Sequence, residues 1–88
     1  MLKITLLGNT SQEEYAEYDF SGTALELLRK NHDVFYRGNL RCVDEICSSR
    51  DYYWYFYINS ALGPDPAAYR VKRGEVIEFR FEKWRNDR

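Results

Sequence analysis

The chain has 88 residues, the length of a single domain, and its 13 basic and 14 acidic residues leave a formal net charge of -1. This balance argues against a general polyanion-binding protein, because such domains are usually strongly basic. No stretch approaches the roughly 20 apolar residues of a membrane span, and residues 1–9 lack the basic start and the cleavage site of a signal peptide. We therefore expect one cytoplasmic domain over residues 1–88, with no membrane partner.

The N-terminal segment alternates between apolar and polar residues, which is typical of strands. Residues 2–7 predict a first strand whose even-numbered side chains face the core. We expect a turn at residues 8–11 and a second strand over residues 14–20, paired with the first as an antiparallel hairpin.

The apolar period then changes from two to 3.6, which predicts one helix near residues 23–31. Thr23 and Glu26 have the spacing of a capping box, in which each side chain satisfies a backbone amide of the other residue. A helix this short does not persist alone in water, so it must lie on a sheet.

Short strands are expected at residues 34–36 and 40–46, with a turn between them. Within a continuous strand, Cys42 and Cys47 would lie on opposite faces, so we expect two reduced thiols rather than a disulfide. His32 is the only histidine, and a closed zinc site needs four ligands, so we expect no metal. We interpret His32 itself as a surface histidine just after the helix.

Residues 52–58, with the sequence YYWYFYI, hold six of the fifteen aromatic residues and predict a strand. Alternation places Tyr52, Trp54, Phe56 and Ile58 toward the core and Tyr53, Tyr55 and Tyr57 on the other face. Two interpretations of this second face remain open. The three phenols either pack under a cover or stand in solvent as a stacking surface, and with the helix used on the core side we expect them to be exposed.

The C-terminal third begins with a loop over residues 59–68, in which two prolines argue against helix and central strand. A short strand at residues 69–71, a turn around Gly74 and a last strand over residues 76–81 follow, and in the last strand Ile77, Phe79 and Phe81 should face the core. The element order predicts an α+β fold of the β-grasp type, a mixed sheet with one helix packed on one face. Its first and last strands should be parallel neighbours at the centre.

With that order in place, the chain resembles the transcobalamin-like C-terminal domain family, a soluble-ligand-binding branch of the β-grasp group. The similar motifs are the helix opening at residues 21–28 (SGTALELL), the strand end at residues 54–59 (WYFYIN), and the turn and strand at residues 74–81 (GEVIEFRF). Ser60 stands where the family usually has glycine, and Glu75 where it has aspartate. The resemblance implies a ligand-binding role, which in vertebrate cobalamin carriers is closure over a corrinoid.

We therefore expect a non-enzymatic binding or interaction module. Its candidate site is the aromatic face of Tyr53, Tyr55 and Tyr57, with Asn59, Tyr69 and the adjoining loop at the rim. The expected partner is a protein or a flat small molecule such as a corrinoid, and self-association through the tyrosine face would give a homodimer.

The alternative is a single-stranded nucleic-acid-binding protein that uses the same tyrosines together with Arg37, Arg41 and Arg50. Nucleic acid is the less favoured partner because of the charge balance. An enzyme is least expected, because no phosphate-binding loop, catalytic triad or paired acid and base can be placed. We name no catalytic residue and no cofactor.

Overall fold

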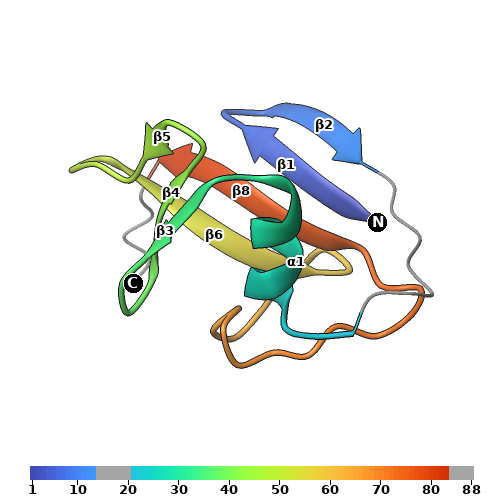
Figure 1. Cartoon of the computed structure of the whole chain (residues 1–88). Helices are drawn as coiled ribbons and strands as arrows, with labels where there is room; N and C mark the ends of the chain where they lie inside the picture. Colours follow the sequence, from blue (N-terminus) through green and yellow to red (C-terminus); the bar gives the residue numbers. More distant parts are fainter. Residues whose placement is uncertain (14–20, 84–88) are drawn as a thin grey trace.

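The main sheet has five strands in the order β2-β1-β8-β6-β7 in the computed structural model, which describes residues 1–13 and 21–83 (Figure 1). The strands are β1 (Leu2–Leu6), β2 (Asn9–Glu13), β6 (Tyr52–Ile58), β7 (Ala61–Leu62) and β8 (Ile77–Lys83). β1 pairs with β8 in parallel and the other pairs are antiparallel. The mixed sheet with adjacent first and last strands is therefore confirmed.

The first hairpin turns earlier than expected. Its loop is Leu7-Gly8, with φ values of 51° and 93°, and Asn9 pairs directly with Leu6. The expected turn at residues 8–11 is therefore wrong. The reason is that β2 reads Asn-Thr-Ser-Gln-Glu, which has no apolar alternation to mark a strand. The second strand expected at residues 14–20 lies outside the described residues.

The helix α1 (Ala24–Asn31) lies across one face of this sheet (Figure 1). The capping box is confirmed: the amide of Glu26 donates to Thr23 Oγ1 at 3.1 Å, and the amide of Thr23 donates to Glu26 Oε1 at 2.7 Å. Further first-turn amides donate to the carbonyls of Tyr69, at 2.8 Å, and of Pro66, at 3.0 Å. The loop over residues 59–68, which we call the proline loop, and the adjoining Tyr69 thus cap the helix and hold it against the sheet.

The core lies between α1 and the facing side of the sheet. Leu2 of β1, Leu28 of α1 and Phe79 of β8 are fully buried, and Trp54 and Phe56 of β6 are buried beside them. The Phe56 and Phe79 rings stack with their centres 5.2 Å apart. The expected inward faces of the first, aromatic and last strands are confirmed.

A second sheet of three strands, in the order β3-β4-β5, packs beside the first. It comprises β3 (Val34–Tyr36), β4 (Leu40–Val43) and β5 (Ile46–Cys47). The single strand expected over residues 40–46 is wrong, because the chain reverses at Asp44, whose φ is 57°. Asp can adopt this left-handed conformation at low cost, so a two-residue turn forms inside what looked like one strand.

That turn also overturns the expectation of two reduced thiols. Cys42 and Cys47 are directly opposite in the β4–β5 ladder, with Cα atoms 4.0 Å apart, and they form a disulfide. Opposite residues of an antiparallel pair lie on the same face, whereas the prediction had assumed one continuous strand.

The segment before β8 is less regular than expected. The strand predicted at residues 69–71 is reduced to one bridge between Thr23 and Arg70. The turn around Gly74 is confirmed, with a φ of 88° and a hydrogen bond from the Glu75 amide to the Lys72 carbonyl at 3.2 Å.

Candidate functional site

The tyrosine face of β6 lies on the side of the sheet opposite α1, but it is not an exposed aromatic patch. Tyr57 is only 6% exposed, while Tyr53 and Tyr55 are half-buried. The expectation that nothing covers this face is therefore wrong for Tyr57. The prediction considered only whole elements as covers and neglected long side chains from neighbouring strands.

A polar network of Arg80, Glu78 and Thr5 lies beside Tyr57 on this face. The guanidinium of Arg80 lies 3.9 Å from the centre of the Tyr57 ring and donates to Glu78 Oε1 at 3.1 Å. Glu78 is 4% exposed, and its Oε2 also accepts from the Thr5 hydroxyl at 2.6 Å. Burial raises the pKa of Glu78, but the bonds from Arg80 and Thr5 outweigh it and hold that pKa below its ordinary value. The network therefore supplies hydrogen-bond donors and a positive charge to the buried Glu78 carboxylate.

Asn59 has a structural role in the β6–β7 turn. Asn59 and Ser60 have φ values of 49° and 72°, which are the two left-handed positions of a type I′ hairpin turn. The Asn59 amide donates to the carbonyl of Val76 at 2.8 Å, and its side-chain oxygen accepts from the Val76 amide at 2.8 Å. Its polar groups therefore hold the start of β8.

Tyr69 lies on the other side of the sheet from the three strand tyrosines. Its ring packs against that of Phe56, on the helix side, with the centres 6.1 Å apart. Its hydroxyl donates to Glu75, and this hydrogen bond raises the pKa of Tyr69. The structure thus does not bring the five predicted site residues together.

A hollow of about 290 Å³ lies between the β3–β4 turn and the proline loop. Trp54 and Phe56 of β6 lie at its base, and Leu62, which is 67% exposed, lies on its wall. The remaining lining residues are Gly38, Asn39, Leu40, Tyr55, Gly63, Pro64, Asp65 and Pro66. Part of the loop predicted at the rim of the site therefore does line a concave surface, but beside the edge of β6 and not on its tyrosine face.

Tyr36 joins the two walls of this hollow. Its hydroxyl donates to Asp65 Oδ1 at 2.7 Å and approaches the carbonyl of Gly38 at 3.4 Å. The bond to the carboxylate raises the pKa of Tyr36, because ionising the phenol would place two negative charges side by side. Asp65 also accepts from the amide of Ala67 at 3.0 Å, so its charge is already solvated by protein donors.

Sequence reasoning missed this hollow because its two walls come from segments more than twenty residues apart. The only available signal was the run Gly63-Pro64-Asp65-Pro66, which predicted an irregular loop without indicating what it faces.

A second, polar hollow of about 340 Å³ lies at the end of α1. His32 Nδ1 lies 2.9 Å from Asp44 Oδ2, and the amide of Asp33 donates to Asp44 Oδ1 at 3.2 Å. The histidine that we interpreted as a plain surface residue therefore has a carboxylate partner. The residues that line this hollow include no serine, threonine or cysteine whose hydroxyl or thiol the pair could activate.

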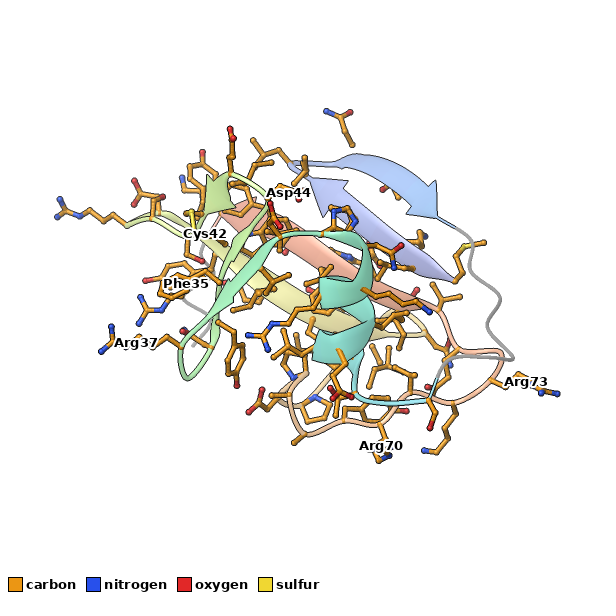
Figure 2. All side chains as sticks on the ribbon, viewed as in Figure 1. Phe35, Arg37, Cys42, Asp44, Arg70 and Arg73 are labelled. Carbon is orange, nitrogen blue, oxygen red and sulfur yellow. A yellow bond between two sulfur atoms is a disulfide. The ribbon has the colours of Figure 1, made fainter. Side chains whose placement is uncertain are left out.

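The exposed arginines lie in at least two separate places on the molecule (Figure 2). Figure 2 shows Arg37 beside Phe35 at one end of the molecule and Arg73 at the opposite end. Arg37, Arg41 and Arg50 are all exposed and belong to or flank the second sheet.

Comparison with family models, with curated proteins and with solved structures found no match. Across residues 1–13 and 21–83, no helix has the length and apolar character to cross a membrane. The same residues contain no group of three His, Cys, Asp or Glu side chains placed to hold a metal ion.

Proposed function

We propose that this protein is a small, non-enzymatic binding module of the β-grasp type, related to the transcobalamin-like domains. The parallel contact of β1 with β8, formed after a hairpin and a crossing helix, supports the β-grasp arrangement. The capping box at Thr23 and the tight turn at Asn59-Ser60 occupy the positions of the motifs on which the resemblance rests.

The binding site in this proposal is the hollow beside β6, in place of the tyrosine face. The observation that carries it is a concave surface with buried Trp54 and Phe56 at its base and exposed Leu62 on its wall. Concave, largely apolar sites with a few polar groups are the usual form of binding pockets. A volume of about 290 Å³ is at the small end of that class, so it suits one side chain or a small group. A corrinoid would extend far beyond it.

Three alternatives have less support. A nucleic-acid site would use the strand tyrosines for stacking, but Tyr57 is buried under Arg80. Self-association through the tyrosine face is weakened by the same burial. An enzymatic role for the hollow beside β6 would require an acid and a base in its lining, whereas His32 and Asp44 line the separate polar hollow.

Nuclear magnetic resonance amide-shift mapping tests the proposal. The labelled protein is titrated separately with cyanocobalamin, a single-stranded oligonucleotide and a pool of short apolar peptides. We expect shifts to gather at Leu40, Leu62 and Gly63, and to disappear in Leu62→Asp but not in Leu7→Asp. Leu7 is a matched control because it is 61% exposed and does not line the hollow. Shifts gathered at Tyr53 and Tyr55, or none with any ligand, would contradict the proposal.

A further inference from the structure

One edge of β6 is open for part of its length. β6 pairs with β8 from Tyr52 to Ile58, but β7 pairs only with Tyr57 and Ile58 on the other edge. Among the described residues, no strand pairs with residues 52–56 on that outer edge. An unpaired strand edge presents backbone donors and acceptors that can template another strand.

The hydrogen bonds at the two ends of this open stretch show which backbone groups face outward. The amide of Ser49 donates to the carbonyl of Tyr52, and the amide of Gly63 donates to the carbonyl of Phe56, each at 2.8 Å. Along a strand, successive residues direct their backbone groups to alternate edges. Trp54, midway between these two residues, therefore directs both its N–H and its C=O to the outer edge.

The open edge coincides with the hollow. Trp54, Tyr55 and Phe56 all line it, and the β3–β4 turn and the proline loop form its walls. Backbone groups shielded from water need partners, so an N–H and a C=O that no described residue pairs, beside a largely apolar hollow, favour an occupant that supplies a matching pair. An extended peptide backbone supplies this pair at every second residue.

The size and charge of the hollow limit which peptide segment and which side chain can bind there. The three residues Tyr53–Tyr55 between the two flanking bonds span about 10 Å at roughly 3.3 Å per residue, which matches about three residues of an added strand. Asp65 is the only acidic or basic residue of the lining, and its carboxylate already accepts from Tyr36 and Ala67. A neutral, apolar side chain therefore fits best between Leu40 and Leu62.

We propose that the outer edge of β6 at Trp54 receives an extended, uncharged peptide segment by strand addition, with one apolar side chain in the hollow. The added segment continues the line of β7, which already pairs with the far end of the same edge. This inference rests on the proposed function, since it names the class of partner for the same hollow.

The test begins with the free protein. Hydrogen exchange should be faster at the Trp54 amide than at the Tyr53 and Tyr55 amides, which face β8. A Trp54 amide as protected as these two would show that the edge is already closed, and would overturn the inference.

The second step selects binders from a display library of short random peptides. The selected peptide, made synthetically, should protect the Trp54 amide from exchange. N-methylation of the one peptide residue that faces Trp54 should weaken binding about tenfold or more, whereas N-methylation of the next residue should have little effect. Leu62→Asp should weaken binding and Leu7→Asp should not.

The outcomes separate the two proposals. A peptide that shifts the hollow residues but leaves the Trp54 amide unprotected, or tolerates N-methylation everywhere, overturns strand addition and leaves the hollow as a binding site. Failure to select any peptide that Leu62→Asp weakens also overturns strand addition. If cyanocobalamin and the oligonucleotide also leave the hollow unperturbed, the proposed function fails as well.

Discussion

The guanidinium carbon of Arg80 lies over Tyr57, 3.9 Å from the centre of the ring. The same guanidinium pairs with Glu78, whose carboxylate is almost completely buried. One side chain from β8 therefore covers an aromatic ring of β6 and neutralises a carboxylate of its own strand. This arrangement makes Tyr57, at one end of the tyrosine face, part of the folded interior.

Acid should destabilise the protein through Glu78. Its pKa in the folded state is lowered below the ordinary value of 4.5, so its contribution to stability is present above about pH 4.5 and is lost as the pH falls through the folded-state pKa. Unfolding followed by circular dichroism between neutral pH and pH 3 should show this loss. Glu78→Gln should be less stable at neutral pH and should have a flatter pH dependence. An unchanged slope in that variant would exclude Glu78 as the source.

Arg80→Ala tests the partner of that carboxylate. Its removal leaves a buried charge with fewer donors, which costs about 1–3 kcal/mol or more, and it uncovers Tyr57. Arg80→Lys keeps the charge but loses the guanidinium contact with the ring and the geometry of the paired donors, so we expect an intermediate loss. Chemical denaturation measures both. Equal stability of all three proteins would show that the network contributes nothing.

The disulfide can be counted directly. Under denaturing conditions without a reductant, a thiol reagent should find no free thiol, and after reduction it should find the two cysteines of the chain. The closed loop is short, so reduction should lower the free energy of unfolding by only about 2 kcal/mol. Cys42→Ser combined with Cys47→Ser should show the same loss and no further response to reductant. Two free thiols before reduction would contradict the bond.

Truncation of Trp54 should be severe. The side chain is buried against Phe81, with the ring centres 5.2 Å apart, and its Nε1 donates to the carbonyl of Ile46 at 2.9 Å. Trp54→Ala should cost about 3–5 kcal/mol, a large part of the roughly 4–13 kcal/mol expected for a domain of this length. Trp54→Phe keeps most of the ring contact and should cost less. A nearly unchanged melting temperature in Trp54→Ala would mean that the faces of β6 are inverted.

Ser60 offers a stabilising substitution. It occupies a left-handed position with a φ of 72°, in the turn where glycine is the preferred residue. Ser60→Gly should raise the free energy of unfolding by about 0.5–1 kcal/mol, because glycine adopts this conformation without strain. Asn59→Ala should have the opposite effect, since it also removes the bond to Val76. Thermal melts of both variants provide the measurement, and a loss of stability in Ser60→Gly would contradict the strain argument.

Periodicity within single segments determined much of this fold. The 3.6-residue period and the Thr23–Glu26 spacing predicted α1 almost to the residue, and the alternation around Trp54 and Phe79 predicted which faces are buried. These features are local: each depends on residues a few positions apart, whose side chains must share a face whatever the rest of the chain does.

Tertiary structure determined the features of this protein that depend on contacts between distant segments. The polar sequence of β2 became a strand only because β1 offered it an edge, and the reversal at Asp44 brought Cys42 and Cys47 together. The cover over Tyr57 comes from Arg80, 23 positions later, and the hollow beside β6 comes from two loops that meet only after folding. Such contacts depend on how segments far apart in the chain approach each other, and that approach is set by the packing of the whole core.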